Sequence, residues 1–195
     1  SLVVSDTRDD VPTLNGSIEA MPSGRTSYEE ADRSVRWTAQ DRIIAFMKST
    51  DWGRFQIQAR YAGEKNAVFD WNGGTLPSLV KENLDHYVAL YPYQDGVVCS
   101  VTDGVYTLTN VVLPSTQTAV KDNIESNLNF SYADVELSKF QNTISNGAQT
   151  DLKFNNACAM IELTMPSTLD KKVTAISITS NSGVSLSGKG TVQLT

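Results

Sequence analysis

The chain has 195 residues, a length that suits one large β domain, or one domain with the start of a second. Its composition, 40% hydrophobic and 19% charged, is globular and argues against wholesale disorder. The formal net charge of -6 leaves no basic face for nucleic acid, and no apolar run approaches the roughly 18 residues of a membrane-spanning helix.

The chain begins with a polar segment, residues 1–34, that is rich in charge, Pro, Gly and Ser. Its first residues show no basic stretch followed by a long apolar one, so they do not resemble a secretory leader. Only residues 14–20 in this segment have a strand-like pattern, and we interpret them as an edge strand. Arg8, Arg25 and Arg33 are the sites in this segment at which a trypsin-like protease would cut.

Residues 35–195 read as one β domain, because short apolar runs alternate with turn signals throughout. The predicted strands are 35–37, 42–47, 55–61, 67–71, 87–91, 97–101, 105–112, 128–132, 152–154, 157–165, 172–179, 184–186 and 191–194. Two Asp-Gly pairs, at residues 95–96 and 103–104, flank the central run and predict tight hairpin turns. Asn-containing glycine clusters at residues 72–74, 146–147 and 181–183 predict further turns.

Strict alternation in residues 157–165 predicts a strand with one face in the core. We expect Ile161 and Leu163 to be buried on that face. Helix is sparse, with short helices expected only at residues 78–84 and 118–128. The predicted fold class is therefore all-β, with less than about a fifth helix against a typical third.

No motif for catalysis, a metal or a cofactor is complete. Residues 183–191 nearly match a phosphate-binding loop, but Gly190 stands at the hydroxyl position and a strand is expected to follow. Residues 70–74 resemble a calcium loop faintly, and Lys81 stands where its Glu should be. His86 is the only histidine, and the sequence contains no GxSxG nucleophile elbow with which it could form a catalytic triad. We therefore expect no enzyme activity, no cofactor and no metal site.

Two binding features stay open. Trp37, Trp52 and Trp71, with seven tyrosines, are either core and rim residues or a platform on which sugars stack. Cys99 and Cys158 form no CxxC pair, and we interpret them as two buried free thiols, with a single disulfide as the alternative.

An ordered set of short stretches resembles the fimbrillin-like proteins of Bacteroidetes. The stretches are residues 25–28 (RTSY), 35–43 (VRWTAQDRI), 89–93 (ALYPY), 113–117 (LPSTQ), 154–163 (FNNACAMIEL), 173–178 (VTAISI) and 186–188 (LSG). They follow the order of the family and cover the chain from about residue 25 to its end. Gln40 departs from the family, which usually has Gly before the Asp.

The resemblance implies the N-terminal domain of a major or minor fimbrial subunit, with a transthyretin-like Greek-key β-sandwich. Such proteins are exported as lipoproteins to the outer-membrane surface. Removal of their N-terminal strand region after an Arg opens a groove for a strand from the next subunit. The resemblance also implies a second, C-terminal domain, which we expect to be missing from this chain.

We therefore expect a structural subunit or tip adhesin of extracellular fimbriae that mediates cell adhesion. Its partners would be other fimbrial subunits, through β-strand addition, and a host protein or glycan. An outer-membrane surface lipoprotein that binds glycans is the alternative, and a hydrolase is a distant third.

Overall fold

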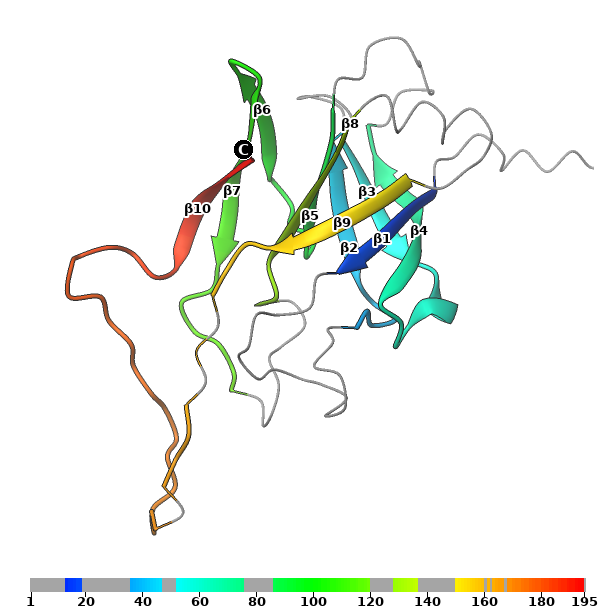
Figure 1. The fold of residues 1–195 in the computed structure, drawn as a ribbon. Coiled ribbons are helices and arrows are strands. Elements are labelled where there is room, and N and C mark those ends of the chain that lie inside the picture. Colours follow the sequence, from blue (N-terminus) through cyan, green and yellow to red (C-terminus); the bar gives the residue numbers. More distant parts are fainter. Residues whose placement is uncertain are drawn as a thin grey trace, which may run out of the picture.

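The computed structural model describes residues 13–18, 36–46, 52–75, 86–119, 128–136, 150–159, 161, 163–166 and 168–194. This part of the chain is all-β, as the sequence predicts, and the helical element whose bounds the structure gives is the 3-10 turn η2 (Ala59–Tyr61) (Figure 1). The strands are β1 (Thr13–Ile18), β2 (Arg42–Phe46), β3 (Trp52–Ile57), β4 (Asn66–Gly74), β5 (His86–Tyr91), β6 (Val98–Thr102), β7 (Val105–Leu113), β8 (Ser131–Glu136), β9 (Thr150–Asn156) and β10 (Gly188–Leu194).

The strands form two sheets. Seven of them close into a barrel in the order β1-β4-β3-β2-β5-β8-β9, and the other three form a sheet in the order β10-β7-β6. Neighbouring strands are antiparallel except β1 and β9, which run parallel. Closure leaves the barrel without a free edge.

The expected edge strand at residues 14–20 is a strand, but it is not at an edge. β1 pairs with β4 on one side and with β9 on the other, so both rows of its backbone groups face a partner. Leu14 and Ile18 point into the barrel, where both are buried. Pairing on both sides and burial of these side chains hold β1 in the body of the protein.

The barrel interior is a filled core built around Trp37, which is 2% exposed. Its ring makes edge-to-face contacts with Phe69, Tyr91 and Phe154, at centroid distances of 5.0, 5.2 and 5.6 Å. Other residues packed in this core include Leu14, Ile43, Phe55, Ile57, Tyr87, Ala89, Ala133 and Leu152. Side chains thus occupy the barrel interior.

A polar turn anchors Trp37 at the entrance to β2. The indole N–H donates to the carbonyl of Lys65 at 2.9 Å. Asp41 accepts from the backbone N–H of Thr38 at 2.6 Å, from the Thr38 hydroxyl at 2.9 Å and from the Tyr91 hydroxyl at 2.9 Å. Burial raises the pKa of the Asp41 carboxyl, and these hydrogen bonds oppose that shift.

A second core joins the barrel to the three-stranded sheet. The outward side chains of β2 and β5, Ile44, Phe46, Val88 and Leu90, pack against residues of β6, β7 and β10. Those residues include Cys99, Tyr106, Leu108, Val111 and Leu194. Strands β2 and β5 are therefore buried on both faces, which explains their nearly continuous apolar sequences, RIIAF and HYVALY.

The tight turn between β6 and β7 forms as predicted. Thr102 faces Val105 in the ladder, and the two residues between them, Asp103 and Gly104, have φ values of 52° and 78°. Such positive angles at both central positions match the twist of a hairpin, and Asp-Gly accommodates them with little strain.

Several other predictions differ from the structure. Residues 157–159, 161, 163–165, 172–179 and 184–186 form no strand, and Ile161 and Leu163 are 65% and 50% exposed, so their expected burial is wrong. Asn72, Gly73 and Gly74 belong to β4 and not to a turn. The helix expected at residues 78–84 lies outside the described residues, as does the one at 118–128 apart from its ends.

Candidate interaction surface

Between β9 and β10 the chain leaves both sheets and forms a long projection, residues 157–187, called the arm from here on. Two extended legs run away from the body and back, as Figure 1 shows in orange. At the base, the Ala157 N–H donates to the carbonyl of Phe130 at 2.7 Å. At the turn, the Leu169 N–H donates to the carbonyl of Pro166 at 3.1 Å. Among the described residues of the arm, the Ala157–Phe130 contact is the one backbone–backbone hydrogen bond to the rest of the molecule.

The arm exposes an unusual number of large apolar side chains. Each of those concerned is between 43% and 65% exposed: Ile161, Leu163, Met165, Leu169, Val173, Ile176, Ile178, Val184 and Leu186. Scattered single exposed residues are ordinary, but soluble monomers rarely expose a connected apolar surface larger than a few hundred Å². A surface of this kind is typical of a site that another protein covers.

The backbone of the arm points to the same conclusion. Among its described residues, the Leu169–Pro166 contact is the one backbone–backbone hydrogen bond within the arm, and no strand pairing involves them. Extended backbone with unpaired N–H and C=O groups is a template for another strand. The arm therefore offers both the hydrogen-bonding groups and the alternating apolar side chains of a β-strand.

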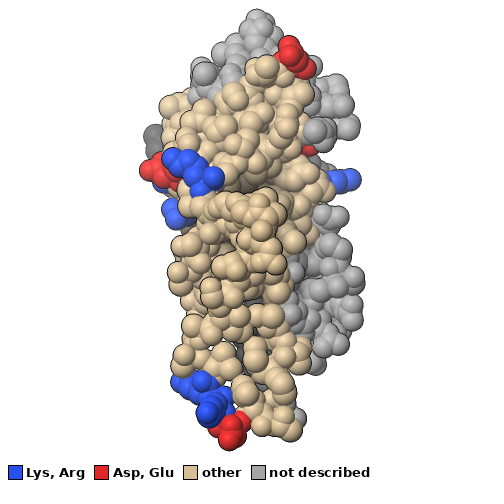
Figure 2. Space-filling model, turned by 90° about the vertical axis from the view of Figure 1, so that its left-hand side faces the viewer, with Lys and Arg blue, Asp and Glu red and all other residues tan. Residues whose placement is uncertain are grey.

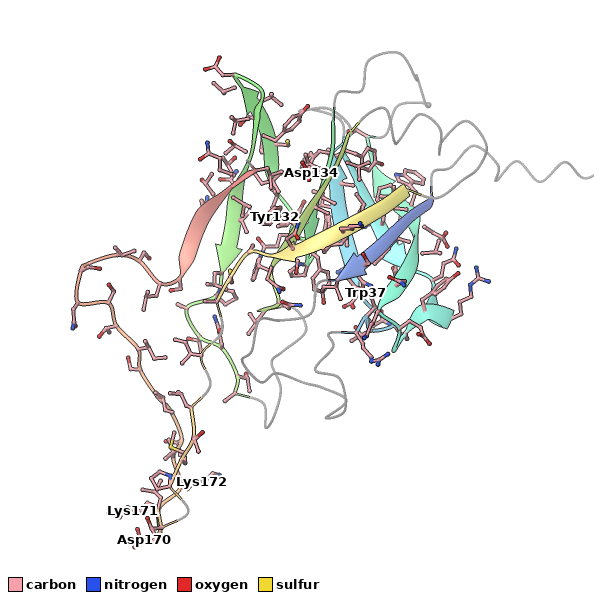
Figure 3. All side chains as sticks on the ribbon, in the orientation of Figure 1. Trp37, Tyr132, Asp134, Asp170, Lys171 and Lys172 are labelled. Carbon is pink, nitrogen blue, oxygen red and sulfur yellow. The ribbon has the colours of Figure 1, made fainter. Side chains whose placement is uncertain are left out.

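Among the described residues of the arm, the charged side chains are those of Asp170, Lys171 and Lys172, which lie together at its far end (Figure 2 and Figure 3). Figure 3 shows these three side chains at the tip, far from Trp37 in the barrel. All three are exposed. Between the tip and the body, the described surface that Figure 2 shows carries no charged side chain.

Within the part of the chain that the structure describes, the three-stranded sheet has two open edges, on β6 and on β10, because each of these strands pairs there with β7 alone. The β10 edge is irregular: its sequence begins Gly-Lys-Gly, and its register shifts between Gly190 and Thr191. Lysines and bulges of this kind protect an edge from further pairing. The β6 edge, Val98–Thr102, has no charge, no proline and an unbroken register. β6 is thus the unprotected edge.

Just before β6 begins, the side chain of Gln94 makes the hydrogen bonds to β7 that a strand residue would make. The amide of Gln94 donates to the carbonyl of Val112 at 2.7 Å and accepts from the N–H of Val112 at 2.8 Å. It thereby imitates a backbone bridge to β7. Asn110, which has a φ of 63°, donates from its side chain to the carbonyl of Gly96 at 3.2 Å. These two side chains fix the start of the β6 edge.

The structure separates the residues of the predicted sugar platform. Trp37 is in the barrel core, Trp52 packs at the margin of the second core, and Trp71 on β4 is 40% exposed. His86 begins β5, and residues 183–191 run along the arm into β10. The two cysteines are free, but only Cys99 is buried, so the expectation of two buried thiols is half wrong. Burial raises the pKa of Cys99 to about 11.

Two kinds of feature are absent from the described residues. No helix there is long and apolar enough to cross a membrane. No group of three or more His, Cys, Asp or Glu side chains in this part of the chain is placed to hold a metal ion.

Comparison of the sequence with protein-family models and with curated proteins finds no match, and comparison with solved structures finds none either.

The sequence does not predict the arm. It predicts strands at residues 157–165 and 172–179, because apolar and polar residues alternate there. Alternation shows that a segment has one apolar face, but it does not show whether the covering partner belongs to the same molecule.

Proposed function

We propose that this protein is a structural subunit or tip adhesin of surface fimbriae, exported to the outer-membrane surface, and that strand addition joins it to neighbouring subunits. The arm carries this proposal, because it exposes unpaired extended backbone together with a row of apolar side chains. Strand addition satisfies both features at once: main-chain hydrogen bonds supply affinity, and alternate side chains fill the partner's pockets.

Two further observations support the proposal. The sequence stretches that resemble fimbrillin-like proteins carry the expectation of a transthyretin-like Greek-key sandwich, with which an all-β fold of two packed sheets is compatible. β1 also precedes Arg25 and Arg33 in the chain, so cleavage after either residue would leave β1 held by noncovalent contacts alone. Its departure would expose the edges of β4 and β9 to a replacement strand.

The proposal predicts reversible self-association through the arm. Sedimentation velocity over roughly 1 to 100 μM, the range of moderate protein–protein affinities, should show wild-type protein forming larger species as concentration rises. A double variant, Ile161→Asp with Ile176→Asp, should stay monomeric, because it places charges on the apolar face of each leg.

The matched control is Thr168→Asp with Asn181→Asp, which adds the same charge to the arm at exposed polar positions. This control should associate as the wild type does. A wild-type protein that stays monomeric throughout the range would contradict the proposal. Glycan-array binding by that monomer, lost in Trp71→Ala, would favour the glycan-binding alternative.

A further inference from the structure

The β6 edge shows signs of a missing neighbour. Val101 lies on the inner face of β6, with Val97 and Cys99, and its ladder partner Tyr106 is 9% exposed. Val97 and Cys99 are 6% and 3% exposed, yet Val101 is 42% exposed. An apolar side chain that points inward and is still half exposed is what an added strand would cover.

The second leg of the arm contains a segment that fits this edge. Residues 172–179, KVTAISIT, place Thr174, Ile176 and Ile178 on one face of an extended chain. Ile176 and Ile178 are each 50% exposed and come after the charged tip. The segment is as long as residues 96–103, which comprise β6 and its flanking turn residues.

We propose that residues 172–179 of one copy add antiparallel to β6 of a second copy. This inference rests on the proposed function and names its donor and acceptor. The register that pairs Ile176 with Cys99 also pairs Thr174 with Val101 and Ile178 with Val97. All three donor side chains then lie on the inner face, where they extend the second core.

Charge complementarity selects this register. It places Lys172 opposite Asp103, the exposed residue of the β6–β7 turn. A parallel arrangement over the same residues would put Lys172 beside Gly96, at the other end of β6. An exposed ion pair contributes little affinity, but opposite charges across an edge fix register and orientation.

The contact joins two different surfaces, so it does not close into a symmetric dimer. Each copy carries both the donor segment and the acceptor edge, and a head-to-tail contact of this kind generates open chains. The same copy does not supply both parts, because its arm enters the sheet at β10, across β7 from the β6 edge, and extends away from the body (Figure 1).

Complementation between two blocked variants tests the inference. Val101→Lys directs a charge inward at the acceptor edge and leaves the arm intact, whereas Ile176→Asp blocks the donor and leaves β6 intact. Each variant alone should associate at least about tenfold more weakly than wild type, a loss that corresponds to one charge placed in an apolar contact. Their mixture should form a 1:1 dimer and no larger species, because it contains one functional donor and one functional acceptor.

Val98→Lys is the matched control, since Val98 lies on the outer face of the same strand and is 48% exposed. It should associate as wild type does. Circular dichroism checks that each variant is folded. If Val101→Lys still associates while the arm double variant does not, the β6 acceptor is wrong and the fimbrial proposal stands. If wild type itself stays monomeric, both are overturned.

A disulfide tests the register directly. In a Cys158→Ser background, where the remaining Cys99 is buried, Ser100→Cys and Ala175→Cys place thiols on directly opposite residues of the outer face. Antiparallel neighbours bring such residues within disulfide range. Mixing the two proteins under mild oxidation should give a cross-linked heterodimer. Ser182→Cys, an exposed arm position outside the segment, is the control, and equal yields with it would overturn the register.

Discussion

At the scale of single residues, the polar turn between Trp37 and Asp41 shows how a buried charge is tolerated in a small barrel. The Asp41 carboxylate is removed from water, and three hydrogen bonds from Thr38 and Tyr91 replace part of its hydration. The loss of solvation outweighs them, so the pKa of Asp41 is raised in the folded state. The phenol of Tyr91, buried beside this carboxylate, has its pKa raised as well.

This shift predicts how stability depends on pH. The ordinary pKa of the Asp41 carboxyl is 3.8, and its folded value is higher. Between the two values the folded state binds more protons than the unfolded state, so the free energy of unfolding falls as pH rises through this window. The Asp41 contribution is therefore most favourable below the ordinary pKa and levels off above the folded one.

Urea unfolding of wild type and Asp41→Asn at several pH values between about 3.5 and 7 measures this effect, since the window opens at the reference carboxyl pKa. Asn does not titrate, so the stability of wild type relative to the variant should decrease as pH rises. A difference that stays constant would contradict the raised pKa, and one that increases would show a lowered pKa.

At the scale of elements, β1 depends on a small residue at its centre. A Cβ added to Gly16 would lie 3.1 Å from a ring carbon of Phe69 and 3.2 Å from one of Phe154. Both rings pack against Trp37 and have little room to move. Gly16→Ala should therefore destabilise the protein by about 1–3 kcal/mol, as overpacking of a filled core does.

Chemical denaturation checks this prediction, with Gly190→Ala as the control. Gly190 also lies in a strand, but its added Cβ would have only the Val111 carbonyl oxygen nearby, at 3.9 Å. A Gly16→Ala variant as stable as the control would show that the rings of the barrel core shift to accept the added methyl group at little cost in stability.

The sequence predicts most strands because their alternation and turns are local. The Asp103-Gly104 turn and the doubly buried run of β5 are examples. It does not predict that β1 closes a barrel, because the partners of a strand are distant in the chain and alternation does not identify them. The same ambiguity led Leu163 to be predicted as core, although it is half exposed on the arm.

The candidate interaction surface was harder to predict than the fold. The open β6 edge follows from the order of the three-stranded sheet, which depends on long-range pairing of β10 with β7. Residues 172–179 were predicted as a strand, and only the structure shows that no strand of the same molecule pairs with their described backbone. The local pattern therefore predicts a strand at residues 172–179, but it does not predict that this strand pairs with another copy of the chain.

At the scale of the whole molecule, the shared strands β2 and β5 couple the two cores. Ile43 and Tyr87 point into the barrel, while their neighbours Ile44 and Val88 point into the second core. Neither core can lose these strands without exposing apolar side chains of the other. The body of the protein should therefore unfold in one cooperative transition.

Two truncations, one in each core, test this coupling. Leu152→Ala in the barrel and Leu108→Ala in the three-stranded sheet remove side chains that are 0% exposed, and each should lower the free energy of unfolding by about 2–5 kcal/mol. Val98→Ala, at a half-exposed position, should change it by less than about 0.5 kcal/mol. Because the cores share β2 and β5, far-UV circular dichroism and tryptophan fluorescence should give the same midpoint in every variant. If Leu108→Ala instead separates the two midpoints, the three-stranded sheet unfolds before the barrel and the cores are not coupled.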